Sequence, residues 1–136
     1  MNTLTPRAVL VTRETDYERL IGAHATRAQT DFYLRSRRQT MDTVEAAHQG
    51  FLAAVHQVRS AIPADWRVTR AGRADLDRFL FTPEDIIIVI GQDGLVANVA
   101  KYLDGQPVLG VNPAPEVNEG VLVPLSVQSA PRLMLA

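Results

Sequence analysis

The strongest constraint on how this chain folds is a run of five consecutive β-branched residues, Ile86 to Ile90. β-Branched side chains favour strands, and a strand without alternating polar residues must be covered on both faces. A turn signal precedes the run at Thr82-Pro83, and Gly91 follows it directly. This pattern is typical of a central strand in a parallel sheet. We therefore expect an α/β fold, a Rossmann-like three-layer sandwich with a mainly parallel open sheet of roughly four or five strands.

Shorter apolar runs predict the other strands, at residues 7–13, 66–70, 107–111 and 121–125. Between them, helices are predicted from capping residues and from apolar residues that recur every three or four positions. The first predicted helical segment is one that Thr15 or Asp16 caps and Gly22 interrupts, and the second covers residues 26–38. The third runs from Val44 to Ile62, with Thr40, Asp42 or Thr43 as its cap and Pro63 as its stop, and the fourth runs from Leu95 and ends at Gly105. Residues 86–111 then form a strand–helix–strand unit, which we expect to be right-handed.

The length and composition predict one folded domain and exclude several classes of function. The chain has 136 residues, of which 46% are hydrophobic, so one core can form. A net charge of -1 gives no general attraction to nucleic acid or anionic membranes, and without cysteine there is no thiol nucleophile. Because the sequence has neither a signal-peptide pattern nor an apolar run of about 18 residues, we expect a cytoplasmic protein with no membrane partner.

The turn after the central strand, Gly91-Gln92-Asp93-Gly94, is the best candidate for a functional site. Ligands of open α/β sheets bind at the carboxyl ends of the strands. Gly91 and Gly94 permit backbone angles closed to other residues, and the start of the following helix favours phosphate. Asp93 can hold Mg²⁺ or take a proton from an attacking hydroxyl. The alternative is that Asp93 only caps the helix and the glycines only make a tight turn.

Two stretches carry a resemblance to a known family. They are Gly91-Gln92-Asp93-Gly94-Leu95 and, on the next predicted strand, Pro107-Val108-Leu109-Gly110-Val111-Asn112. From Asp85 to Asn112 the chain resembles the N-terminal domain of the NAD kinase family, within the superfamily that also holds the diacylglycerol kinases. That family has Gly-Gly-Asp-Gly-Thr in the turn and Pro-Val-Leu-Gly-Ile-Asn in the strand. The Asn-Glu pair that lipid kinases carry soon after the turn is absent here.

The resemblance implies transfer of phosphate from ATP, or from polyphosphate, to the ribose 2′-hydroxyl of NAD, with Mg²⁺ as cofactor. Asp93 would be the catalytic carboxylate, and no side chain is assigned as a metal ligand. The residues expected to bind nucleotide are Gly91, Gln92, Gly94, Leu95 and Asn112, together with Thr12 and Arg13 at the end of the first strand. For Asn112, a simple turn role is an equally weighted alternative.

The resemblance also implies a domain organisation. Residues 1–125 would form the N-terminal nucleotide-binding domain, and residues 126–136 a tail leading to a second domain absent from this chain. In the family that domain supplies much of the NAD site and the dimer contacts. We therefore expect a homo-oligomer, and we expect this chain by itself to be an inefficient kinase.

The departures from the family pattern leave other functions open. Gln92 replaces the second glycine of the turn, and Leu95 replaces its hydroxyl residue. One alternative is a non-catalytic regulatory relative that binds nucleotide. Another is a kinase of the same superfamily that acts on a different hydroxyl substrate.

The remaining polar candidates are expected to have structural or surface roles. His24, His48 and His56 all fall on predicted helices, and His48 and His56 are too far apart to share a metal ion. The basic cluster Arg35, Arg37 and Arg38 is read as a solvated helix end in preference to an anion-binding patch.

Overall fold

The computed structural model describes residues 5–24, 26–113 and 125–126, and it confirms the α/β fold. The sheet has five strands in the order β2-β1-β3-β4-β5, and every pairing is parallel. The strands are β1 (Arg7–Thr12), β2 (Arg67–Gly72), β3 (Asp85–Ile90), β4 (Val108–Asn112) and β5 (Leu125–Ser126). The run of β-branched residues forms β3, which pairs with β1 on one side and β4 on the other. Most of the predicted strand at 121–125 lies outside the described residues.

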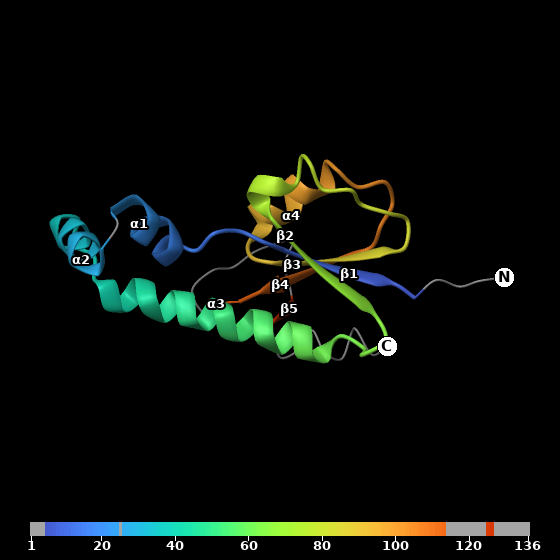
Figure 1. Cartoon of the computed structure of the whole chain (residues 1–136), viewed down its shortest axis with the longest axis horizontal. Helices are drawn as coiled ribbons and strands as arrows, with labels where there is room; N and C mark the ends of the chain where they lie inside the picture. Colours follow the sequence, from blue (N-terminus) through green and yellow to red (C-terminus); the bar gives the residue numbers. More distant parts are fainter. Residues whose placement is uncertain (1–4, 25, 114–124, 127–136) are drawn as a thin grey trace.

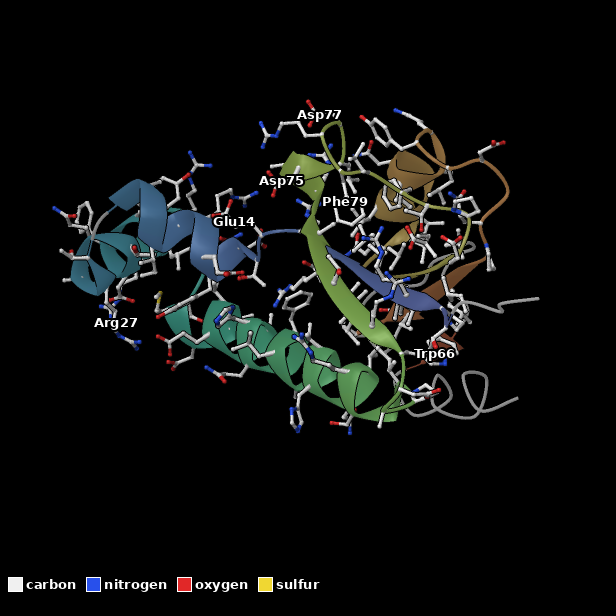
Figure 2. All side chains as sticks on the ribbon, turned by 45° about the vertical axis from the view of Figure 1, so that its right-hand side comes forward. Glu14, Arg27, Trp66, Asp75, Asp77 and Phe79 are labelled. Carbon is white, nitrogen blue, oxygen red and sulfur yellow. The ribbon has the colours of Figure 1, made fainter. Side chains whose placement is uncertain are left out.

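Helices cover both faces of this sheet, as the unbroken apolar pattern of β3 requires (Figure 1). On one face α3 (Met41–Ala61) packs on side chains from β1, β3 and β4; on the other lies α4 (Asp93–Ala100). Trp66, directly before β2, packs on the α3 side of the sheet, and Phe79, after β2, packs on the α4 side (Figure 2). The segments before and after β2 therefore both add to the core. The buried α3-side cluster contains Ala8, Leu10, Phe51, Ala54, Val55, Val58, Ile62, Ile88, Ile90 and Val111.

The two strand–helix–strand connections run in opposite directions along the sheet. The chain passes from β1 through α3 to β2 on one side, and from β3 through α4 to β4 on the other. Because their helices lie on opposite faces, the two connections have the same hand. The strand order therefore reverses between β1 and β3, which makes their carboxyl ends the topological switch point of the sheet.

Two short helices lie beyond the carboxyl edge of the sheet (Figure 1). These helices, α1 (Asp16–His24) and α2 (Arg27–Ser36), contact each other and α3, and Arg27 of α2 forms an ion pair with Glu45 of α3. The predicted break at Gly22 is wrong, because α1 continues through this residue to His24. Gly22 is exposed, and a single exposed glycine costs a helix only about 1 kcal/mol.

Capping residues set the ends of α2 and α3. Thr40 accepts a hydrogen bond from the amide of Thr43 at 3.3 Å, so α3 begins at Met41, before the first predicted apolar position. The helix stops at Ala61, where Pro63 was expected to end it. α2 stops at Ser36 instead of continuing to Arg38, because Arg38 has a left-handed backbone with φ of 58°.

A buried ion pair joins the amino ends of the central strands, at the edge opposite the switch point. Arg7 and Asp85 are register partners, and the Arg7 guanidinium donates to both carboxylate oxygens at 2.7 Å. The Asp85 carboxylate also accepts from the amide of Thr82 at 2.7 Å and from its hydroxyl at 2.9 Å. Asp85 is fully buried, so these donors satisfy a carboxylate that has no access to water.

Candidate functional site

The switch point holds a pocket of about 320 Å³, which we call the inner pocket. It opens where β1 and β3 end, so it lies at the position that open α/β sheets use for ligands. The residues that line it are Arg13, Glu14, Thr15, Asp16, Phe51, Ile90, Gly91, Gln92 and Pro113. Three of the predicted site residues therefore meet here: Arg13, Gly91 and Gln92.

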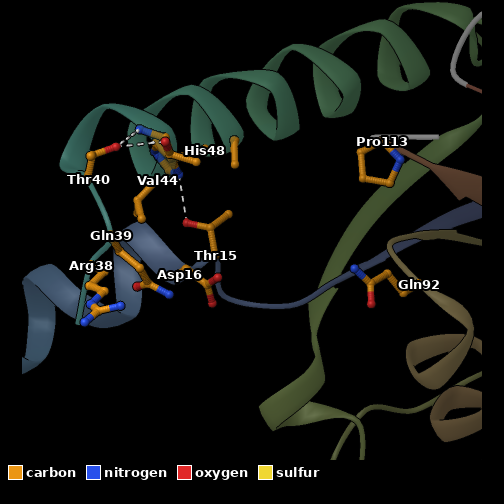
Figure 3. A pocket seen from close by; sticks show the side chains of 11 residues that line it. Thr15, Asp16, Arg38, Gln39, Thr40, Val44, His48, Gln92 and Pro113 are labelled. Atoms are coloured by element: carbon orange, nitrogen blue, oxygen red, sulfur yellow. Dashed lines mark hydrogen bonds between the residues drawn. The ribbon is translucent and has the colours of Figure 1, made fainter. Parts of the chain in front are cut away.

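A second cavity of about 540 Å³, the outer pocket, lies between the turn after β3, the start of α1, the turn that joins α2 to α3, and the first part of α3 (Figure 3). Its lining consists of Thr15, Asp16, Arg38, Gln39, Thr40, Thr43, Val44, Ala47, His48, Gln92 and Pro113. Four of these residues also line the inner pocket, namely Thr15, Asp16, Gln92 and Pro113. The two pockets therefore adjoin through a shared wall at the carboxyl edge of the sheet.

The turn between β3 and α4 is only two residues long, Gly91 and Gln92. The amide of Gly91 donates to the carbonyl of Val111 at 3.0 Å, which ties the turn to β4. Gln92 is the residue before α4 and makes no capping hydrogen bond with its side chain, which instead lines both pockets. The main chain of this turn therefore lies close to the pockets. The side chain of Gln92 is exposed beside them.

The structural reason for the two glycines differs from the expected one. Neither Gly91 nor Gly94 has the left-handed backbone that was expected; among the described glycines, Gly105 has it, with φ of 86°. A Cβ on Gly91 would lie 3.0 Å from Cδ2 of Leu95, whereas a Cβ on Gly94 would meet nothing within 4 Å. Close packing against Leu95, in the first turn of α4, thus explains why residue 91 is a glycine. No contact explains why residue 94 is one.

Asp93 is the first residue of α4, so it belongs to the helix and follows the turn. Its side chain lies outside what the structure describes. The helix start that carries it faces the carboxyl edge of the sheet, and helix N-termini attract anions through their free amides. The main chain of Asp93 therefore belongs to the helix end that favours phosphate.

The other predicted binding residues have different surroundings. Leu95 is buried against the α4-side core and so presents no side chain to a ligand. Asn112 is buried at the end of β4, directly before Pro113, which lines both pockets. Thr12 is also buried, and its hydroxyl accepts a hydrogen bond from Nε of Arg70 at 3.1 Å.

Arg70 adds positive charge to this edge, and sequence reasoning missed it. Its guanidinium lies 6.0 Å from the ring centroid of Phe51, which lines the inner pocket. With Arg13 in the lining, the inner pocket has a cationic side chain in its wall and a second one close by. These two cations attract anions, and the carboxylates of Glu14 and Asp16 line the same pocket.

His48, for which a structural or surface role was predicted, makes structural contacts and also lines the outer pocket. Thr15 and Glu18 form a capping box, in which the Thr15 hydroxyl accepts from the Glu18 amide and the Glu18 carboxylate accepts from the Thr15 amide, each at 3.1 Å. The same hydroxyl lies 2.8 Å from Nδ1 of His48, whose ring stacks on Tyr17 at 4.7 Å between centroids. The capping-box spacing is visible in the sequence, but its contact with a residue 33 positions away is not.

The implied cofactor Mg²⁺ requires side chains that could hold it. The described residues contain no group of three or more carboxylate or histidine side chains that could hold a metal ion. Mg²⁺ bound with a nucleotide needs only one or two carboxylates, because phosphate oxygens and water complete its shell. Glu14 and Asp16 line the inner pocket and are carboxylates of the required kind, although Asp16 also pairs with Arg19 at 2.8 Å.

Comparison with known proteins does not place the chain in a family. The chain matches no protein-family model, and none of the curated proteins shows significant similarity to it. No helix in the described part of the chain is long and apolar enough to cross a membrane.

Proposed function

We propose that the chain is the nucleotide-binding domain of an NAD kinase-like phosphotransferase, which moves phosphate from ATP or polyphosphate to the ribose 2′-hydroxyl of NAD. The observation that carries this proposal is the position of the Gly91-Gln92-Asp93-Gly94 segment. It begins α4 at the switch point of the sheet, beside a pocket that Arg13 lines. A homo-oligomer in the cytoplasm is part of the proposal.

In this proposal each group of the inner pocket has a separate task. The start of α4 and Arg13 bind phosphate. Glu14 or Asp16 would hold Mg²⁺, which would neutralise phosphate charge. Asp93 takes the proton from the attacking hydroxyl. Phosphoryl transfer depends mainly on positioning and charge neutralisation, so a short, well-anchored turn suits this chemistry.

The second candidate is a regulatory relative that binds nucleotide without transferring phosphate. It is favoured by Gln92, whose side chain lines both pockets at a position where the kinase family has glycine. A kinase for a different hydroxyl substrate is a third candidate and would use the same turn.

The test is a coupled assay for NADP formation with ATP, Mg²⁺ and NAD, on the longest natural form of the protein. Replacing Asp93→Asn should lower kcat by roughly 10²–10⁴-fold, the usual contribution of a positioned general base, while ATP binding is retained. His56→Ala, an exposed change on α3, is the control and should leave activity unchanged.

Two results would count against this function. A folded protein that binds ATP but forms no NADP would favour the regulatory relative or a kinase for another hydroxyl. Equal activity of wild type and Asp93→Asn would remove the proposed role of that carboxylate.

A further inference from the structure

Six of the eleven residues that line the outer pocket have hydroxyl, amide or imidazole side chains, which form hydrogen bonds. These are the side chains of Thr15, Gln39, Thr40, Thr43, His48 and Gln92. Of the two charged residues in the lining, Asp16 is already paired with Arg19, and Arg38 lies in the turn between α2 and α3 (Figure 3). Val44, Ala47 and Pro113 add apolar surface, which makes up more than half of the pocket wall together with the carbon atoms of the polar side chains. Hydroxyl and amide side chains both donate and accept, which suits the hydroxyl groups of a ligand.

The His48 ring is held in a defined orientation within this lining. Thr15 contacts Nδ1, and Tyr17 stacks on the ring with planes inclined by 25°. In the described part of the chain, Nε2 has no hydrogen-bond partner. Whichever nitrogen carries the proton, Nε2 can therefore donate to a ligand hydroxyl or accept from one.

Thr40 and Thr43 supply a further donor to the pocket. Their hydroxyl oxygens lie 2.8 Å apart, and the Thr40 oxygen also accepts the Thr43 amide. One O–H···O contact uses only one of the two hydroxyl protons. The other proton is available to a ligand in the pocket, which both residues line.

We propose that the outer pocket binds the sugar part of the phosphoryl acceptor. Sugar hydroxyls bond to Nε2 of His48, to the Thr40–Thr43 pair and to the amide of Gln39, while the C–H face of the ring lies on Val44 and Ala47. This inference rests on the proposed function: the outer pocket shares Thr15, Asp16, Gln92 and Pro113 with the inner pocket, so a ligand that fills it extends toward the turn before Asp93. The volume of about 540 Å³ is typical of small-molecule sites, which span roughly 300–1,000 Å³.

Sugar hydroxyls can come from the ribose of a dinucleotide or from a free sugar, and a binding experiment separates the two sources. The full chain with isotope-labelled histidine is titrated, in separate samples, with NAD, D-ribose, D-glucose and ATP–Mg²⁺, while the ring signals of His48 and His56 are followed by NMR. We expect NAD or one of the free sugars to shift the His48 signals saturably and to leave those of His56 in place. ATP–Mg²⁺ tests the inner pocket independently.

Variants test whether the contact is the one proposed. His48→Ala and Gln39→Ala should each weaken binding of the active ligand by roughly two- to tenfold, the loss expected for one neutral hydrogen bond to a ligand. His48→Gln, which keeps an amide near the position of Nε2, should retain part of the affinity. His56→Ala should bind as wild type does. Gln39→Ala keeps the test valid if His48→Ala fails to fold, because the Gln39 side chain has no hydrogen-bond partner within the described residues.

The possible results separate this inference from the proposed function. If NADP forms normally and the KM for NAD is unchanged in His48→Ala and Gln39→Ala, the inference is wrong and the kinase function stands. If a free sugar shifts His48 and NAD does not, the inference stands and NAD is the wrong acceptor. If ATP–Mg²⁺ binds and neither NAD nor the sugars shift His48, the sugar site is refuted.

Discussion

At the scale of single residues, Arg38 is the clearest departure from ordinary backbone geometry. It is the described non-glycine residue with positive φ, at 58°. The amide of Gln39 bonds to the carbonyl of Leu34 at 2.8 Å and that of Arg38 to Arg35 at 3.1 Å, which is a Schellman motif. Glycine usually fills the left-handed position of this motif, so an arginine there costs stability and has to be tolerated by its surroundings.

Replacing Arg38→Gly should therefore stabilise the protein. Removing the left-handed penalty gains about 1–2 kcal/mol, and the greater freedom of glycine in the unfolded chain costs about 0.5–1 kcal/mol. The expected net gain is roughly 0.5–1 kcal/mol, measured as a higher urea midpoint. Arg37→Gly is the control and should destabilise, because φ at Arg37 is -107° and its guanidinium lies over the ring of Tyr33 at 4.6 Å. A loss of stability in Arg38→Gly would show that the arginine side chain contributes more than its backbone costs.

At the scale of elements, the attachment of α4 to β3 depends on one close contact in the turn. Gly91 packs against Leu95, which is buried in the α4-side core and cannot move away freely. The second glycine, Gly94, lies in the first turn of α4 with open space at its Cβ position. A side chain at position 91 would thus be crowded, whereas a side chain at position 94 would have open space.

We expect Gly91→Ala to destabilise the protein by about 1–3 kcal/mol, the usual cost of overpacking. Gly94→Ala should stabilise it by about 0.5–1 kcal/mol, because alanine restricts the unfolded chain and favours the helix. Thermal unfolding of the two variants beside wild type checks both signs. If Gly91→Ala is as stable as wild type, Leu95 can repack and the turn is looser than the contact indicates.

At the scale of the whole molecule, the Arg7–Asp85 ion pair holds the central strands together at the edge opposite the pockets. Burial by itself raises the pKa of Asp85, but hydrogen bonds from Arg7 and Thr82 outweigh it, so the pKa of Asp85 lies below its ordinary value. The same contact raises the pKa of Arg7 above its ordinary value. Because the folded-state pKa of Asp85 is lowered, its stabilisation is present above the unfolded pKa and is lost as the pH falls through the folded pKa.

Asp85→Asn should cost about 3–5 kcal/mol at neutral pH, since it leaves the Arg7 charge without its buried partner. The difference from wild type should begin to shrink below the ordinary carboxylate pKa of about 4, where the unfolded chain takes up a proton, and should reach its minimum below the lower folded-state pKa of Asp85. Urea unfolding from pH 7 to pH 2 measures this. Asp75→Asn, at a pair whose side chains are 59% and 72% exposed, should change stability by less than about 1 kcal/mol at any pH. A difference for Asp85→Asn that stays constant down to pH 2 would contradict the assignment.

Much of the fold could be predicted from the sequence, because its signals are local. The β-branched run indicated β3, Thr40 was among the residues expected to cap α3, and the turn Thr82-Pro83 preceded the strand as expected. Gly22 shows the limit of such signals. A glycine lowers helix propensity, but the Thr15–Glu18 capping box and the contacts of α1 with α2 and α3 outweigh that cost.

The sequence by itself determined that this chain has a central strand buried on both faces, helices to cover it and the segment Gly91-Gln92-Asp93-Gly94 at its carboxyl end. Only the tertiary structure decided the strand order, which brings the ends of β1 and β3 together, and the placement of α1 and α2 beyond the sheet. The two adjoining pockets and the contact between Thr15 and His48 follow from that placement. The physical reason is that periodicity and capping act over a few residues, whereas pockets form between surfaces that are distant in the chain and meet only when the core packs.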